Sequence, residues 1–207
     1  MQSVCGYESY IFDVDGTIFD AAPGILSALR AAIERCGIPV PVGKLNQSLI
    51  GPKLPEMIDS LGVADSVDVK SKIIAAFRDI YDSNLGAGVV LYPAARKVLA
   101  DCADKTLFVA TNKPFAVVKK LFEIFGLNSF KDVYCPDKYS GIVLTKADML
   151  REISEKYGYA PSDMLMIGDT MGDFKAAREC GCDFAFATWG YEKDKKAIAR
   201  QAEIVLE

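Results

Sequence analysis

The second half of the sequence alternates between short apolar runs and amphipathic stretches, and this alternation limits the fold more than any other feature. Apolar runs rich in branched and aromatic side chains predict strands at residues 106–110, 133–135, 165–167, 184–187 and 204–206. Amphipathic stretches predict helices at 114–125, 146–157 and 174–180 and near Ala197. Such alternation is typical of a parallel sheet with helices on both faces, so we expect a Rossmann-like, doubly wound α/β core.

The first strand of this core is expected at residues 10–14, and a long interruption follows it. A helix is predicted from Pro23, and between residues 39 and 91 strand-like runs are absent while short helical segments alternate with glycine and proline. The run Gly86-Ala87-Gly88 is typical of a flexible joint. We therefore expect an α/β core formed by residues 1–19 and 91–207, with a helical cap domain inserted at residues 20–90.

The chain contains no histidine among its 207 residues, and this excludes several catalytic systems. Serine or cysteine nucleophiles activated by histidine, histidine zinc sites and phosphohistidine chemistry all depend on that residue. An enzyme of this composition has to use carboxylates, lysine, tyrosine or cysteine for attack and for proton transfer.

Charge and hydropathy patterning limit the expected partners and location. The 24 Lys and Arg residues against 28 Asp and Glu residues give a net charge of −4, and no basic run is long enough for a nucleic-acid face. No stretch approaches the roughly 20 apolar residues of a membrane span, and the first residues show no secretory signal. We expect a cytoplasmic protein that binds neither nucleic acid nor membrane, with its six cysteines reduced.

Polar side chains follow three of the predicted strands at the points where those strands end. Together with the glycines among them, these residues are Asp13, Asp15, Gly16 and Thr17; Thr111, Asn112 and Lys113; and Gly168, Asp169, Thr170 and Asp173. Ligands of parallel sheets bind beyond the carboxyl ends of the strands, so these residues are expected to face one crevice. Carboxylates so close together repel, and sharing Mg²⁺, which prefers oxygen ligands, would relieve that repulsion. Each aspartate pair by itself also fits a turn or a helix cap.

Four motifs occur in a fixed order along the chain. They are F-D-V-D-G-T-I-F-D at 12–20, V-A-T-N-K at 109–113, T-K-A-D-M-L at 145–150 and I-G-D-T-M-G-D at 167–173. Together they resemble the four motifs of the haloacid dehalogenase superfamily. The resemblance covers essentially the whole chain, because the helical insertion is similar to the small α-helical cap of that superfamily.

The resemblance implies a catalytic role for five residues. Asp13 would be the nucleophile that attacks phosphorus and forms an aspartyl-phosphate, and Asp15 the general acid and then the general base. An aspartate at the second position is what phosphatase-like members have and dehalogenases lack. Thr111 and Asn112 would orient the phosphate, and Lys146 would balance charge on the nucleophile and the phosphoryl group.

The resemblance also implies a magnesium site. Asp13, the backbone carbonyl of Asp15 and Asp169 would be ligands, while Asp173 would support the ion through water or through a hydrogen bond to a ligand. The amides of Gly16 and of the threonine that follows it would complete an anion nest for the substrate.

Specificity is expected to come from the cap, where Gly51-Pro52-Lys53 is the predicted substrate-facing loop. Lys53 either pairs with a second anionic group of the substrate or is an ordinary exposed lysine beside a turn. Trp189-Gly190-Tyr191 is similar to the phosphoglycolate phosphatase-like branch, and we expect a structural role for its aromatic side chains.

The expected function is hydrolysis of a small phosphorylated metabolite by a monomeric or homodimeric phosphatase of the phosphoglycolate phosphatase type. The same motifs also fit a 5′-nucleotidase, a pyrophosphatase or a β-phosphoglucomutase-like phosphotransferase. A non-catalytic binding module would be expected to lose Asp13, Asp15 or Asp169, and all three are present.

Overall fold

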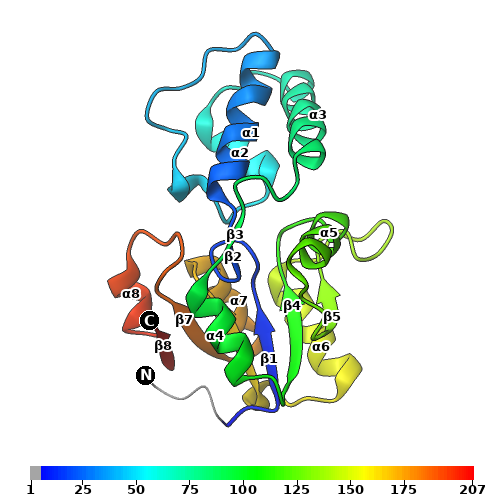
Figure 1. Ribbon diagram of the computed structural model, residues 1–207, viewed down its shortest axis with the longest axis vertical. Coiled ribbons are helices and arrows are strands. Elements are labelled where there is room, and N and C mark those ends of the chain that lie inside the picture. Colours follow the sequence, from blue (N-terminus) through cyan, green and yellow to red (C-terminus); the bar gives the residue numbers. More distant parts are fainter. Residues whose placement is uncertain (1–5) are drawn as a thin grey trace.

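A six-stranded parallel sheet forms the centre of the lower part of the molecule (Figure 1). The computed structural model describes residues 6–207. Along the sheet the strands are β5 (Phe130–Tyr134), β4 (Thr106–Ala110), β1 (Ser9–Phe12), β6 (Met164–Gly168), β7 (Asp183–Ala187) and β8 (Ile204–Leu206).

Helices cover both faces of this sheet because alternate side chains of its strands point in opposite directions. On β1, Tyr10 and Phe12 belong to one core cluster and Ile11 to the other. The first cluster is covered by α4 (Pro93–Asp101) and α5 (Phe115–Phe125), and the second by α6 (Lys146–Tyr157), α7 (Met171–Cys180) and α8 (Lys195–Ala199). The predicted doubly wound α/β core is confirmed.

The order of the strands places a switch point at β1. The chain runs outward from β1 through β4 to β5, then returns to β6 on the other side of β1. Phe12 is in register with Val109 of β4 and with Ile167 of β6. The segments that follow these three strands therefore begin side by side, at the place where ligands of open α/β sheets bind.

Three further helices form a separate body above the carboxyl edge of the sheet, called here the helical unit: α1 (Ala22–Arg35), α2 (Leu54–Leu61) and α3 (Val67–Ser83) (Figure 1). Pro23 lies in the first turn of α1, where its missing N–H costs nothing. Along each helix, apolar side chains that recur every three or four residues are buried. Leu29 on α1 and Ile73 on α3 are examples.

The helical unit joins the core through two chain segments that pair with each other. Phe19–Asp20 (β2) and Val90–Leu91 (β3) form a two-stranded antiparallel ribbon. The prediction that residues 39–91 contain no strand is therefore wrong for the last two residues of that range, Val90 and Leu91. A pair of two-residue strands is too short to produce a periodic pattern in the sequence.

The first strand, predicted at residues 10–14, ends at Phe12, and two other predicted boundaries are wrong by three residues each. The helix predicted from residue 174 begins at Met171, because the Thr170 side chain caps it and Asp173 completes a capping box. The strand predicted at 133–135 begins at Phe130 and includes Lys131 and Asp132. Polar residues are common on an edge strand such as β5, and they hide its start from a search for apolar runs.

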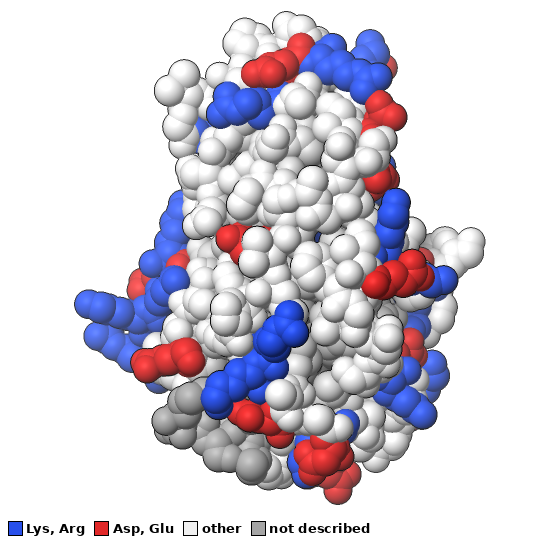
Figure 2. Space-filling model, viewed as in Figure 1, with Lys and Arg blue, Asp and Glu red and all other residues white. Residues whose placement is uncertain are grey.

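The surface shown in Figure 2 carries basic and acidic side chains intermixed around its outline, without a broad field of either sign. Among residues 6–207, no helix is both long enough and apolar enough to cross a membrane.

We predict that Tyr191→Phe destabilises the protein by about 1–3 kcal/mol, because it leaves a buried backbone donor without its acceptor. The Tyr191 hydroxyl accepts a hydrogen bond from the N–H of Ala21, at 2.9 Å, where α1 begins. Urea-induced unfolding measures the loss. Tyr139→Phe is the matched control: that hydroxyl donates to Glu152 on the surface, and its removal is expected to cost less than about 0.5 kcal/mol. Equal losses in the two variants would contradict the buried role of Tyr191.

Candidate active site

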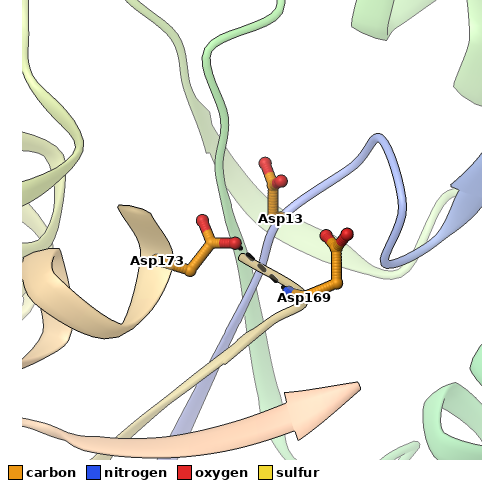
Figure 3. A group of neighbouring side chains, drawn as sticks. All are labelled: Asp13, Asp169 and Asp173. Atoms are coloured by element: carbon orange, nitrogen blue, oxygen red, sulfur yellow. Dashed lines mark hydrogen bonds between the residues drawn. The ribbon is translucent and has the colours of Figure 1, made fainter. Parts of the chain in front are cut away.

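Three carboxylates converge at the carboxyl edge of the sheet (Figure 3). Asp13 follows β1, Asp169 follows β6, and Asp173 lies in the first turn of α7. All three are buried, and each offers an oxygen within 4.8 Å of the others. The sequence prediction that these residues face one crevice agrees with their positions.

Burial and mutual repulsion make the charged forms of these acids unfavourable. Burial raises the pKa of Asp13 to about 6, although the nearby Lys146 ammonium opposes the shift. Burial also raises the pKa of Asp169 well above its usual range, and the charges of Asp173 and Asp13 add to the effect. The cluster therefore requires a compensating positive charge at neutral pH.

Lys146 supplies part of that charge. It is the first residue of α6, and the Thr145 side chain caps the helix so that the lysine points toward the acids. Its Nζ lies 3.0 Å from Asp13 Oδ1 and also pairs with Asp173. Burial alone would lower the pKa of Lys146, but the two carboxylates outweigh it, so the pKa is raised. One lysine faces three acids here, so part of their charge is left uncompensated.

The cluster fits a divalent cation. Asp13 Oδ1 is buried, and the Lys146 ammonium at 3.0 Å is shared with Asp173, so the oxygen keeps capacity to bind a cation. The candidate ligand atoms of the cluster are all carboxylate oxygens, which suit a hard cation such as Mg²⁺. Asp169 is held by Thr17, whose hydroxyl donates to Oδ1 at 2.9 Å, and by the N–H of Tyr191, which donates to Oδ2 at 2.8 Å.

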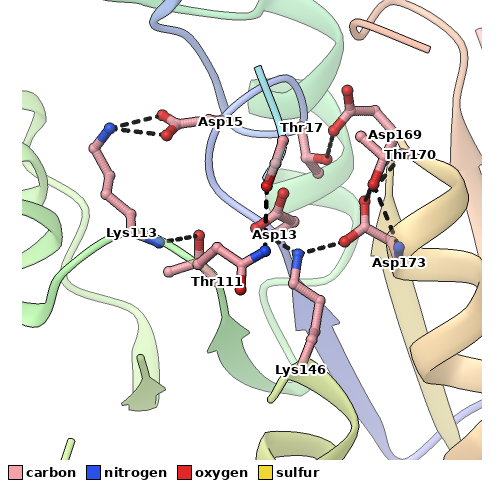
Figure 4. A network of polar contacts seen from close by, with 11 residues as sticks. Asp13, Asp15, Thr17, Thr111, Lys113, Lys146, Asp169, Thr170 and Asp173 are labelled. Atoms are coloured by element: carbon pink, nitrogen blue, oxygen red, sulfur yellow. Dashed lines mark hydrogen bonds and ion pairs between the residues drawn. The ribbon is translucent and has the colours of Figure 1, made fainter. Parts of the chain in front are cut away.

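Asp173 is itself fixed by hydrogen bonds from the backbone. Its Oδ2 accepts from the N–H of Asp169 at 3.2 Å, and from the N–H and hydroxyl of Thr170 at 2.9 Å and 2.7 Å. The carboxylate thus orients the loop that carries Asp169 while its other oxygen pairs with Lys146 (Figure 4).

Two glycines leave the space that Asp169 occupies. A Cβ on Gly16 or on Gly190 would lie 2.2 Å from an atom of the Asp169 side chain. The structure differs from the predicted anion nest at Gly16, because this N–H donates to the carbonyl of Phe19 at 2.8 Å within the turn. The contribution of Gly16 here is its positive φ of 87° and its lack of a side chain.

Asp15 points away from the three-acid cluster (Figure 4). Its two carboxylate oxygens accept from Lys113 Nζ at 3.0 Å and 2.8 Å, and the same ammonium donates to the hydroxyl of Tyr81 on α3 at 3.1 Å. Burial would lower the pKa of Lys113, but Asp15 more than offsets it, and the pKa is raised. Asp15 is therefore held by a buried cation that also contacts the helical unit.

The residues after β4 connect the core to the loop before α2. The Asn112 side chain donates to the carbonyl of Gly51 at 3.2 Å, and the Thr111 hydroxyl accepts from the N–H of Lys113 at 3.3 Å. Lys53, which precedes α2, lines the space between the helical unit and the core. The predicted substrate-facing loop does lie beside the acids.

Two cavities meet at this loop, and both include Lys53 and Asn112 in their walls. One has a volume of about 100 Å³ and is bounded by Asp13, Asp15 and side chains of the helical unit. The other, of about 520 Å³, is bounded on the core side by residues such as Lys146.

Three residues were given no catalytic or binding role from the sequence, and a fourth has a different contact from the one expected. Thr17 was expected to contribute its amide to the anion nest, whereas its hydroxyl donates to Asp169. Lys113 belongs to a motif that had been recognised, and its place directly after a predicted strand is the signal that could have pointed to it. Tyr81 and Tyr191 lie far along the chain from their partners, and no local pattern marks them. The structural role expected for the aromatic side chain of Tyr191 agrees with its hydrogen bonds to the start of α1.

Comparison with known proteins gives a family match and several similar proteins. The family model described as haloacid dehalogenase-like hydrolase matches residues 10–187. The chain is 29% identical over 209 residues to a phosphoglycolate phosphatase of Vibrio parahaemolyticus, covering 94% of this chain and 89% of that protein. A haloacid dehalogenase-like family hydrolase from Streptococcus pneumoniae superposes with a TM-score of 0.85 at 24% identity, covering 96% of this chain and 93% of that one.

The chain is also 31% identical over 183 residues to the tyrosine-protein kinase PtkA of Mycobacterium tuberculosis. That match covers 87% of this chain but only 62% of the relative, so the chain spans less than two thirds of the length of PtkA.

The raised pKa values of Asp13 and Asp169 predict how the stability of the metal-free protein depends on pH. Because their pKa values are raised, these acids bind protons more tightly in the folded protein than in the unfolded chain. Proton binding therefore stabilises the folded state fully below the unfolded aspartate pKa of about 4. This stabilisation is lost as the pH rises through about 6, the raised pKa of Asp13. In a chelator, we expect Asp169→Asn to gain stability relative to the wild type between about pH 4 and pH 7.

Chemical denaturation of both proteins at several pH values, with and without Mg²⁺, measures this difference. Added Mg²⁺ is expected to raise the free energy of unfolding of the wild type at neutral pH and to change that of the variant little. Asp65→Asn, a change at an exposed aspartate before α3, is the control. A stability difference that does not vary with pH would contradict charge repulsion in the cluster.

A second prediction concerns the contact between Lys113 and its two partners. Lys113→Met leaves the Asp15 carboxylate without its buried cation and is expected to cost about 3 kcal/mol of unfolding free energy. Tyr81→Phe removes one of two acceptors and is expected to cost only about 1 kcal/mol. Urea-induced unfolding gives both values, and the reverse ranking would show that Asp15 is not the main partner.

Proposed function

The chain belongs to the haloacid dehalogenase-like hydrolase family, and we propose that it is a magnesium-dependent phosphatase acting on a small phosphate monoester. The family match and the relatives named phosphoglycolate phosphatase support this proposal. The observation that carries it is the state of Asp13, whose Oδ1 is buried at the end of β1 and faces the Lys146 ammonium at 3.0 Å.

In the first half-reaction, a carboxylate oxygen of Asp13 forms a bond to phosphorus and the bond from phosphorus to the leaving oxygen breaks. The proton of Asp15 goes to that oxygen, so the product leaves as a neutral alcohol. Asp15 suits this role because its carboxylate borders the same cavity as Asp13 without joining the three-acid cluster.

In the second half-reaction, Asp15 takes a proton from water, the water oxygen attacks phosphorus, and the bond to Asp13 breaks to release inorganic phosphate. When bound, Mg²⁺ would neutralise charge shared by the carboxylates and the phosphoryl oxygens. Asp13, the backbone carbonyl of Asp15 and Asp169 are the proposed ligands, with Asp173 holding the Asp169 loop through its hydrogen bonds.

The remaining contribution to the proposed catalysis is the positioning of the phosphate by side chains around it. Thr111 and Asn112 would orient the phosphate, and Lys146 would stabilise negative charge on the transferring group. Lys53 is proposed as a substrate-facing residue on the basis of its place in both cavity walls.

We also propose that residues 20–90 act as a cap domain on a core of residues 1–19 and 91–207. Support comes from the β2–β3 ribbon, which brings both ends of the helical unit together above the site (Figure 1). The proposed substrate is a small phosphorylated metabolite, and the cytoplasmic location and the monomeric or dimeric state stay predictions.

Turnover of p-nitrophenyl phosphate tests the mechanism. We expect wild-type activity to require Mg²⁺ and to be lost in a chelator, and Asp13→Asn to lower kcat by about three orders of magnitude or more, because the nucleophile is gone. Asp65→Asn is the control and is expected to match the wild type. Turnover that is insensitive to both the chelator and Asp13→Asn would contradict the proposal.

A panel of metabolite phosphates then distinguishes phosphatase from phosphomutase. Release of inorganic phosphate identifies a phosphatase, whereas an isomerised hexose phosphate identifies a mutase.

A further inference from the structure

We propose that the substrate's leaving group is apolar, with the bulk of a single ring or a short branched chain. This inference rests on the proposed phosphatase function and concerns the cavity of about 100 Å³ between the helical unit and the core, called here the inner cavity.

The walls of the inner cavity are mainly hydrocarbon. Side chains from α1, the loop before α2, α2, α3 and α5 contribute, namely Ile25, Ile50, Leu54, Met57, Phe77 and Val117. These residues come from elements far apart in the sequence, and most of them are buried. Free energy is gained when an apolar group displaces water from a concave, largely apolar surface of this kind.

The position of Asp15 determines which part of the substrate occupies this space. Asp13 and Asp15 both border the inner cavity, whereas Lys146 and Asp173 border the outer one. The oxygen that receives the proton of Asp15 has to lie beside that carboxylate. The carbon skeleton attached to this oxygen then extends into the inner cavity, while the phosphoryl group lies against Asp13, toward the outer cavity that Lys146 borders.

The charges around the inner cavity do not favour a second anionic group on the substrate. The buried cation in its wall is Lys113, which already pairs with Asp15 and donates to Tyr81. Lys53 is half-buried and Arg78 is exposed, so both are solvated and would compensate a buried carboxylate only weakly. A carboxylate carried into the cavity would lose its hydration without a matched partner.

The volume sets the size of the group. An enclosed apolar cavity of about 150 Å³ binds benzene. The inner cavity, at about 100 Å³ and open on one side, accommodates most of one ring or a short branched chain.

Specificity constants for benzyl phosphate, 2-phosphoglycolate and glycerol 3-phosphate test the inference with Mg²⁺ present. All three are esters of primary alcohols, so the chemistry at the leaving oxygen is similar. We expect kcat/KM for benzyl phosphate to exceed the other two by about tenfold or more. Equal values, or a preference for a charged or polar ester, would overturn the apolar leaving group while leaving the phosphatase intact. If none of the three esters is hydrolysed, the proposed phosphatase function is overturned as well.

Two variants tie the preference to the inner cavity. Val117→Thr keeps the shape of the side chain but adds a hydroxyl, and Phe77→Ala removes a ring from the wall. In each, we expect the ratio of kcat/KM for benzyl phosphate to that for methyl phosphate to fall by about threefold to tenfold. Ile142→Ala, at a residue that is 57% exposed and lines neither cavity, is the control and should keep the wild-type ratio. Unchanged ratios in both cavity variants would overturn the assignment, and thermal unfolding of Val117→Thr checks that its fold is intact.

Discussion

The repulsion among three buried carboxylates is the constraint on which the rest of the site depends. Asp13, Asp169 and Asp173 arrive from different elements at one point, and the sheet topology makes that convergence unavoidable. All three side chains are buried, so their charges are poorly screened and have to be balanced locally. Lys146 provides part of the balance, and the small size of Gly190 allows the acids to sit where a cation can complete it. The free energy lost in folding such a site becomes available to whatever positive charge binds there.

The helical unit takes part in the site because it contacts motif residues directly. Asn112 donates to the carbonyl of Gly51, and Lys113 links Asp15 to Tyr81. The residue that would handle the proton is therefore held jointly by the two parts of the molecule. In such an arrangement the chemistry of the core can stay constant while residues of the helical unit change the space offered to the leaving group. For this reason sequence motifs predict the residues that contact the phosphate but not those that contact the leaving group.

The sequence predicted the features that depend on local pattern. Asp13 and Asp169 could be located because polar residues at the ends of buried strands have no role in core packing. Lys113 stood in a recognised motif, yet its pairing with Tyr81 depends on two elements that meet only in the folded chain. The Val90–Leu91 strand escaped detection because it is paired over two residues only. What could not be predicted consists of contacts between distant segments, which periodicity and motif spacing do not encode.

Tyr191 joins two places that otherwise look independent. Its N–H donates to Asp169 at 2.8 Å, and its hydroxyl accepts from the N–H of Ala21, at 2.9 Å, where α1 begins. One residue with a stiff aromatic ring thus spans the distance between an acid of the cluster and the base of the helical unit. Thermodynamic linkage is reciprocal, so any coupling that Tyr191 carries between a charge bound at Asp169 and the start of α1 would act with the same factor in both directions.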